Sequence, residues 1–289
     1  MTRLKLTLAY NGHGLYGWQR QQAKGNHTGH DLPTVEGLLL DAWKKLTGEA
    51  LGNDAFQAAG RTDAGVHALG MVVHVETGWP HAATPIKVMD GLNHYLPDSI
   101  RAVRAAVVDE NFHARFSGVA RHYRYVLYTR RVMRPDWVGR AGHERRALDV
   151  ARMAEALEYL PLGPHDFSAF RDAECQSHDP VCHLLHRRVD DMGEGFVHIH
   201  ISANRFLQHM VRNMVGTLVE CGLREERGRV PRPVDDMARV LATRDRTRAG
   251  ITFAAEGLYF LGVDYPPHTE LAIAGEGGDV DVSGPCQEG

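Results

Sequence analysis

The sequence of 289 residues has little of what marks a secreted or membrane-spanning protein. Its four cysteines are too few and too irregularly spaced for a disulfide framework in a chain of this length. The uninterrupted apolar runs are only a few residues long, so none predicts a transmembrane helix. The N-terminal residues enter a strand-like pattern without the apolar segment of a signal peptide. We therefore expect a globular protein of the reducing cytoplasm that has no membrane partner.

Lysine is also scarce, with 5 residues against 28 arginines, and the net charge of −3 by itself disfavours a nucleic-acid partner. The charge is unevenly distributed, however. Residues 268–289 carry five acids and no Lys or Arg, which leaves +2 on the rest of the chain. Residues 115–146 hold nine arginines and two acids, and Arg124 and Arg134 are among those that we expect to contact the phosphates of a partner. A solvated arginine-rich face would have the same composition.

Alternating and helical periodicities along the chain predict an α+β fold. Strands are expected at 3–10, 71–77, 100–108, 121–129, 196–203 and 258–265, and helices at 34–47, 85–95, 148–160, 206–221 and 234–242. Thr34 is a predicted N-cap and Gly48 a predicted helix stop. The two series of elements indicate two split βαβ subdomains, 1–110 and 111–267, followed by a flexible acidic tail at 268–289.

The loop from Gly60 to Ala68 is the first candidate site. It holds a single carboxylate, Asp63, between glycines that permit a tight turn and close approach of a bulky substrate. Positive charge on Arg61 and His67 would keep Asp63 ionised and suited to nucleophilic attack. A turn-capping aspartate would have the same local sequence, and the residues alone favour that interpretation.

The second candidate is the segment from Asn204 to Gly216. Its apolar positions form a broad helical stripe, and Gln208, His209, Arg212 and Asn213 are expected to form one compact polar patch, with Gly216 leaving room for close approach. An ordinary amphipathic helix is the alternative.

Two further stretches carry weaker signals. Aromatic and arginine side chains interleave in the segment 121–125, which suits base stacking and phosphate contact but is equally typical of a core strand. Five potential metal ligands lie within 12 residues, although their spacing matches no standard zinc site: Cys175, His178, Cys182, His183 and His186.

The loop at 60–68 belongs to a longer series of short stretches. Its Gly-Arg-Thr-Asp-Ala-Gly-Val-His segment is the most specific of them. The others are 9–12, 17–21, 91–93, 96–97, 112–117, 121–125, 165–167, 175–177, 203–216, 245–246, 256–259 and 263–266. In this order, and over about residues 3–267, the chain resembles the TruA family of tRNA pseudouridine synthases.

The resemblance implies a fold, a reaction and partners. The fold would be two ferredoxin-like subdomains that share a continuous, mainly antiparallel sheet, with helices on one side and a basic cleft. The reaction would isomerise uridines of the tRNA anticodon stem-loop, at positions 38–40, to pseudouridine. A homodimer would bind the tRNA across both subunits, and neither metal nor organic cofactor would be needed.

The resemblance also assigns roles to particular residues. Asp63 matches the nucleophile, and Arg212 matches the arginine that pairs with it. Tyr123 matches the tyrosine that stacks on the target uracil and is a candidate base for the C5 proton. Arg61 and His209 match residues that contact the RNA and hold the nucleotide out of the stem.

The chain departs from the family pattern at a few positions. Asn11, Glu36 and Phe253 differ from the usual residues, and residues 22–32 are expected to form an extra loop. None of these positions belongs to the matched catalytic set. Two other functions stay open from the sequence: a non-catalytic tRNA-binding protein of the same fold, and a zinc-dependent enzyme that uses the Cys/His cluster.

Overall fold

The computed structural model describes residues 1–20, 32–225 and 230–267. The predicted acidic tail, and all but the last residue of the predicted extra loop, lie outside these ranges. The strands are β1 (Thr2–Tyr10), β2 (Gln57–Ala58), β3 (His67–Thr77), β4 (Ile100–Val107), β5 (Ala120–Tyr128), β6 (Gly142–His143), β7 (Gly163–Asp166), β8 (Val181–Gly193), β9 (Phe196–Ala203) and β10 (Leu258–Asp264). The helices in the described ranges are α1 (Val35–Thr47), α2 (Pro85–Tyr95), α3 (Val150–Glu158), α4 (Met210–Gly222) and α5 (Asp236–Thr243).

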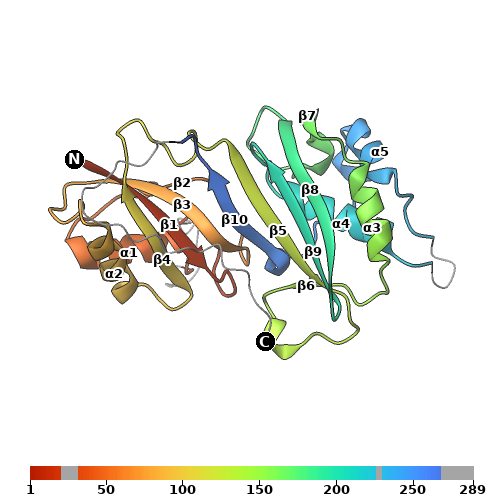
Figure 1. Cartoon of the computed structure of the whole chain (residues 1–289), viewed down its shortest axis with the longest axis horizontal. Helices are drawn as coiled ribbons and strands as arrows, with labels where there is room; N and C mark the ends of the chain where they lie inside the picture. The colour runs from red at the N-terminus through yellow and green to blue at the C-terminus, as the bar shows by residue number, and fades with distance from the viewer. Residues whose placement is uncertain (21–31, 226–229, 268–289) are drawn as a thin grey trace, which may run out of the picture.

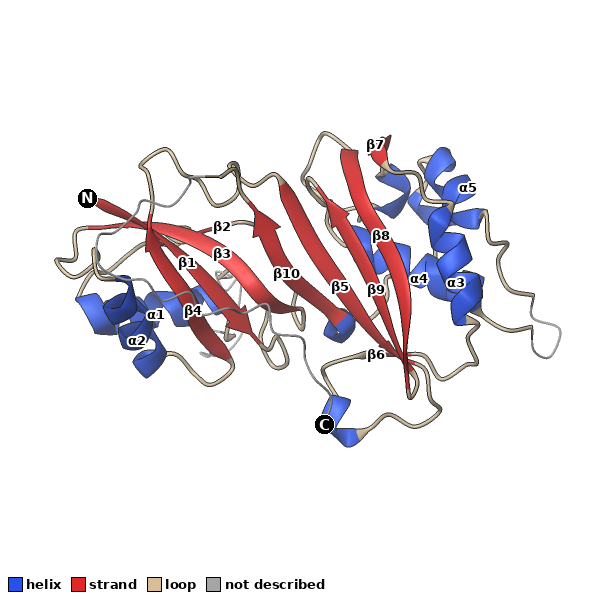
Figure 2. Ribbon diagram, in the orientation of Figure 1, coloured by secondary structure: helices blue, strands red, loops and turns tan. Residues whose placement is uncertain are grey.

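The strands form one sheet, which confirms the α+β class. Its main path runs β4-β1-β3-β10-β5-β9-β8-β7, with β2 and β6 paired at the side (Figures 1 and 2). Every pairing along this path is antiparallel except that between β3 and β10. None of the described helices has the length and apolar character needed to cross a membrane.

The last described strand, β10, lies in the middle of the sheet. It pairs antiparallel with β5 along most of its length, and parallel with β3 where Tyr259 faces His67 and Phe260 faces Ala68. On the main path, β10 therefore stands between the N-terminal strands and the C-terminal strands.

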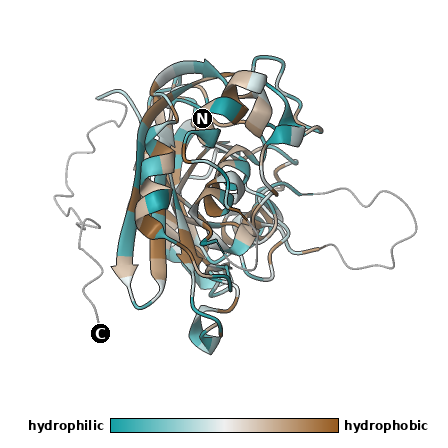
Figure 3. Ribbon diagram, turned by 90° about the vertical axis from the view of Figure 1, so that its right-hand side faces the viewer, coloured by the Kyte–Doolittle hydropathy of each residue, from teal (hydrophilic) through white to brown (hydrophobic). Residues whose placement is uncertain are grey.

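A row of opposed residues crosses five neighbouring strands from β1 to β9. It consists of Tyr10, Ala68, Phe260, Tyr123 and Ile201. Because opposed residues share a face of the sheet, this row defines one face. Helices α1 and α2 pack into the hydrophobic cluster at the β1 end of the row, and α3, α4 and α5 into the cluster at the β9 end, so all the described α-helices cover this face. Figure 3 shows hydrophobic stretches alternating with hydrophilic ones along the ribbon, as this arrangement requires.

The predicted boundaries of the first helix are confirmed. The Thr34 hydroxyl oxygen accepts a hydrogen bond from the Gly37 amide at 3.3 Å, the geometry of an N-cap. Gly48 ends the helix with φ 78°, in the left-handed region where glycine is favoured.

The sequence prediction missed β8 and started β3 four residues too late. In β8 only Cys182 and Leu184 are fully buried, and most of its other side chains are exposed or charged. This strand therefore has no long hydrophobic alternation for a sequence pattern to detect. The candidate metal ligands Cys182, His183 and His186 are strand residues of β8.

The helix predicted at 206–221 begins four residues later, at Met210, because His209 adopts the left-handed conformation with φ 57°. The expected single polar patch is consequently wrong. Asn213 is fully buried and donates a hydrogen bond to the Phe170 carbonyl, whereas Gln208 is exposed. Only His209 and Arg212 of the four point toward Asp63.

The predicted close approach at Gly216 is made by backbone. A Cβ atom at this position would lie 1.8 Å from the Ile251 carbonyl oxygen, so α4 can pack on the segment 250–253 only without a side chain here. The contact is reinforced by the Thr217 hydroxyl, which accepts a hydrogen bond from the Gly250 amide.

We expect Gly216→Ala to lower the free energy of unfolding by about 1–3 kcal/mol, because α4 must move away from Ile251. Urea denaturation measures the change. Gly52→Ala is the control, since its Cβ would meet no atom within 4 Å and its φ is not positive. Equal stability of the two variants would contradict the close packing of α4.

Candidate active site

The loop that carries Asp63 is held by the segment 11–18, and the contacts are largely backbone to backbone. The Trp18 amide donates to the Thr62 carbonyl at 3.0 Å, and the Gly65 amide donates to the Leu15 carbonyl at 3.2 Å. A Cβ on Gly17 would lie 2.6 Å from the Thr62 carbonyl oxygen, so this glycine is required for the approach. The stretches 9–12 and 17–21 of the sequence pattern therefore overlap the two ends of the segment that fixes the Asp63 loop.

Two side chains contact Asp63 through the same oxygen. Its Oδ2 lies 3.0 Å from Arg212 Nη1 and 3.1 Å from His209 Nε2. Within the described part of the chain, Oδ1 of Asp63 accepts no hydrogen bond. The Asp63 side chain keeps 32% of its surface exposed. The contacts to Oδ2 therefore orient the carboxylate, and Oδ1 faces the solvent-accessible side.

The backbone of the segment 250–253 fixes Arg212. Its Nε donates to the Phe253 carbonyl at 2.8 Å while Nη1 reaches Asp63, and the Phe253 amide donates back to the Arg212 carbonyl. Phe253 itself is buried and meets Tyr125 edge to face. Phe253, one of the departures from the family pattern, is thus a core residue that supports Arg212.

His209 contacts a second carboxylate that the sequence did not reveal. Its Nδ1 lies 2.6 Å from Asp172 Oδ2. The Glu174 amide lowers the pKa of Asp172, and His209 lowers it further, against the opposing effect of burial. Asp172 lies 37 residues before His209, and no spacing rule connects the two; the only signal was its position three residues before the stretch 175–177.

Tyr123 lies beside Asp63 on the helix-covered face of the sheet. Its ring meets Phe206 and Phe260 edge to face, at centroid distances of 4.9 and 5.2 Å. Burial raises the pKa of the Tyr123 phenol, and the charge of Asp63 raises it further. The phenol is therefore neutral at physiological pH.

Arg61 is exposed and does not touch Asp63. Its guanidinium lies 3.7 Å from Asp54 with 55% of the side chain exposed. An exposed pair of this kind contributes little to stability, so Arg61 is free to exchange its partner for another anion.

The expected charge on His67 is wrong. His67 is buried, its Nδ1 accepts a hydrogen bond from the Gly12 amide, and its Nε2 donates to the Glu256 carbonyl. Burial lowers its pKa, and this hydrogen-bond pattern requires the neutral ring. The positive charge at Asp63 comes from Arg212 instead.

The nine arginines of 115–146 do not form one surface. Arg121 is buried and donates to backbone carbonyls, including those of Gly118 and Asn204. Arg134 is paired with Asp136 at 2.8 Å. Arg124 stacks over the Tyr259 ring on the face opposite Tyr123, because successive residues of a strand point to opposite faces.

The Cys/His segment does not form a metal site in the described residues, where no group of three or more potential ligands converges. Cys182 is buried, and burial raises the pKa of its thiol to about 11, so the sulfur stays protonated.

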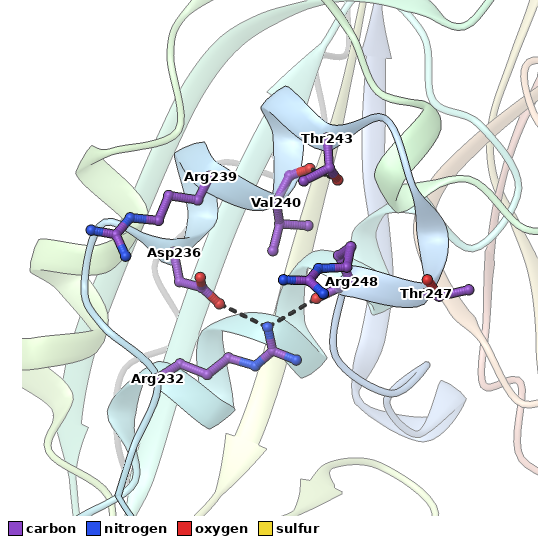
Figure 4. Close-up of a pocket in the computed structure, with 7 residues that line it drawn as sticks. All are labelled: Arg232, Asp236, Arg239, Val240, Thr243, Thr247 and Arg248. Atoms are coloured by element: carbon purple, nitrogen blue, oxygen red, sulfur yellow. Dashed lines mark hydrogen bonds and ion pairs between the residues drawn. The ribbon is translucent and has the colours of Figure 1, made fainter.

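Two cavities lie beside α5 and beside β5. The first, of about 360 Å³, is bordered by α5, and Figure 4 shows Arg232 donating to Asp236 and to the Arg248 carbonyl. Arg232 also pairs with Glu220, so its charge is already balanced. The second, of about 480 Å³, has Tyr123 in its lining together with His122, His186, His200, Ser202, Leu261, Gly262, Val263 and Asp264.

A partly exposed carboxylate that pairs with an arginine, beside an uncharged tyrosine, is typical of an enzyme active site. Residues 156–266 match the family model described as tRNA pseudouridine synthase. The chain is 42% identical to tRNA pseudouridine synthase A of Bordetella petrii, over 98% of this chain and 97% of that protein. The same named protein of Paraburkholderia xenovorans is 43% identical (92% and 91%), and that of Hydrogenovibrio crunogenus 40% (94% and 95%). The chain belongs to the tRNA pseudouridine synthase A family.

Arg212→Lys should lower kcat/KM roughly 10- to 150-fold, the equivalent of about 1.5–3 kcal/mol for one charged hydrogen bond. A lysine ammonium has no planar fork, so it cannot bind the Phe253 carbonyl and Asp63 in the same geometry. Steady-state turnover of tRNA measures the loss, and unchanged kcat/KM would show that the arginine fork is not needed.

Histidines of the opposite face predict a pH-dependent stability. Burial, with Arg124, lowers the pKa of His198 to about 4. The unfolded chain therefore binds this proton first, and stability is lost as the pH falls below about 6.5. We therefore compare the free energies of unfolding of His198→Gln and the parent at pH 7 and at pH 5. Between these two pH values, the difference should shift in favour of the variant by up to about 2 kcal/mol. Urea denaturation at the two pH values measures this, and an identical pH dependence would contradict it.

Proposed function

We propose that this protein isomerises uridines of the tRNA anticodon stem-loop to pseudouridine, with Asp63 as the nucleophile. Membership of the tRNA pseudouridine synthase A family supports the reaction and the tRNA substrate. The observation that carries the catalytic assignment is the asymmetry of Asp63, whose Oδ2 is held by Arg212 and His209 while Oδ1 accepts no hydrogen bond from the described residues.

The target uridine must first leave its stack, at a cost of about a few kcal/mol, because its reacting atoms are inaccessible within a helix. The neutral Tyr123 ring then offers a platform for the uracil, and the exposed Arg61 offers a contact for the displaced backbone. A platform without fixed hydrogen bonds allows the base to turn.

Asp63 Oδ1 then attacks either C6 of the uracil or C1′ of the ribose. The bond between C1′ and N1 breaks and C1′ bonds to C5. The bond between Asp63 and carbon also breaks, and its electron pair returns to Oδ1. C5 loses its proton and N1 gains one, so the product is an isomer of the substrate and Asp63 is a free carboxylate again. Tyr123 is the candidate base for the C5 proton. Its raised pKa keeps the phenol protonated, so its oxygen can accept the C5 proton only as its own proton passes to solvent.

The proposal includes an architecture. Two hydrophobic clusters, one with α1 and α2 and one with α3, α4 and α5, support ferredoxin-like subdomains at 1–110 and 111–267. The acidic segment 268–289 would be a tail outside them. We further propose a cytoplasmic homodimer that holds one tRNA across both subunits without a metal or cofactor. Light scattering with and without tRNA tests the oligomeric state.

The reaction is tested by tritium release from tRNA labelled at C5 of uridine. We expect the native protein to release tritium in the presence of EDTA, and Asp63→Asn to release it at no more than about a thousandth of the native rate. Mapping of the product then locates the modified positions. Asp54→Asn is the matched control, since it removes an exposed carboxylate that pairs only loosely with Arg61.

Each alternative function has its own outcome in this experiment. A native protein that binds tRNA but releases no tritium would be the non-catalytic binder. Release that stops with EDTA and returns with zinc would favour the metal-dependent enzyme. Full activity of Asp63→Asn would remove Asp63 as the nucleophile.

A further inference from the structure

His209 is held between two carboxylates that come from distant parts of the chain. Its Nε2 lies 3.1 Å from Asp63 Oδ2, and its Nδ1 lies 2.6 Å from Asp172 Oδ2. We propose that Asp172 is a positioning residue that keeps both ring nitrogens of His209 protonated and the ring fixed against Asp63. The inference rests on the proposed nucleophilic role of Asp63.

The argument starts from hydrogen-bond chemistry. An ionised carboxylate can only accept hydrogen bonds, and a neutral imidazole has one donor and one acceptor nitrogen. A neutral His209 would therefore set a nitrogen lone pair against one of the two carboxylates. With both nitrogens protonated, the ring donates to Asp63 and to Asp172 at once.

Asp172 is itself fixed for this role. Its Oδ1 accepts a hydrogen bond from the Glu174 amide at 2.9 Å, which leaves Oδ2 directed at His209. The Asp172 amide donates to the Gln208 carbonyl at 3.1 Å, so its loop is tied to the residue before His209. Only 25% of the Asp172 side chain and 23% of the His209 side chain are exposed, which limits screening of the pair by water.

The backbone of His209 is arranged for the same contact. The residue has φ 57° at the start of α4, and its side chain makes no capping hydrogen bond to the helix. Left-handed backbone in a residue other than glycine costs roughly 1–2 kcal/mol and persists where the surroundings impose it. The ring of His209 therefore lies between Asp63 and Asp172 and does not cap the first turn of α4.

Asp172 brings the charges around His209 closer to balance. Asp63 and Asp172 are two negative charges that face Arg212 and the doubly protonated ring, and Arg246 adds a third positive charge near Asp172 from the segment after α5. The neutral phenol of Tyr123 adds no charge. When Asp63 bonds to carbon it loses its negative charge, and Asp172 then remains as the counter-charge of His209, which stays in place for the later steps.

Asp172→Asn tests the proposal with little change of shape. Asparagine keeps an oxygen for the Glu174 amide and turns an N–H donor toward His209 Nδ1, which favours a neutral ring protonated at Nε2. Ring-nitrogen NMR across a pH series follows this, with the His209 signal assigned by its loss in His209→Gln. We expect the pH at which the ring loses its second proton to fall by about one to three units, and kcat to fall about tenfold or more with little change in KM.

Glu174→Gln is the matched control, because it removes one exposed carboxylate two residues away that has no contact with His209. We expect it to leave both the ring signal and kcat unchanged. An unaltered His209 titration in Asp172→Asn would overturn the proposal, as would the same loss of kcat in both variants. The NMR result does not depend on turnover, so it stands apart from the Asp63→Asn experiment: loss of the nucleophile assignment and loss of the Asp172 role are distinguishable.

Discussion

The pairing of β10 between β3 and β5 is the constraint on which the site depends. The N-terminal strands carry the loop of Asp63, and the C-terminal strands carry Tyr123 and pack against α4 with Arg212. Phe260 of β10 lies opposite both Ala68 and Tyr123, so a single strand sets the spacing between the two groups. A shift of one residue in its register would turn Phe260 and Leu258 to the other face, and would remove each from the hydrophobic cluster that it joins.

Close backbone packing at two places then orients the Asp63 carboxylate. Gly17 brings the segment 11–18 against the Asp63 loop, and Gly216 brings α4 against the segment that holds Arg212. Each contact is too close for a side chain, so the positions of both partners of the ion pair are set by backbone rather than by flexible side chains. The nucleophilic role that we propose for Asp63 requires such rigidity.

Charge in this molecule acts through pairing more than through its sum. Arg121, Arg134 and Arg232 are all engaged with carbonyls or carboxylates, so a count of arginines overstates the free positive surface. Around Asp63, by contrast, pairing brings charged groups together at the site. Its two partners, Arg212 and His209, are partly shielded from water, and His209 also contacts Asp172, so a small cluster of side chains carries the electrostatics of the site.

The sequence by itself determined the class of fold, the family, and the loop, strand and helix segment that meet at Asp63, because periodicity and the stretch 60–67 are local features. It also located the helix that begins after Thr34 and ends at Gly48. Only the tertiary structure decided which groups carry charge. It made His67 neutral through two backbone hydrogen bonds, and it brought Asp172 to His209. Those outcomes depend on burial and on contacts between segments far apart in the chain, which no spacing along the sequence encodes.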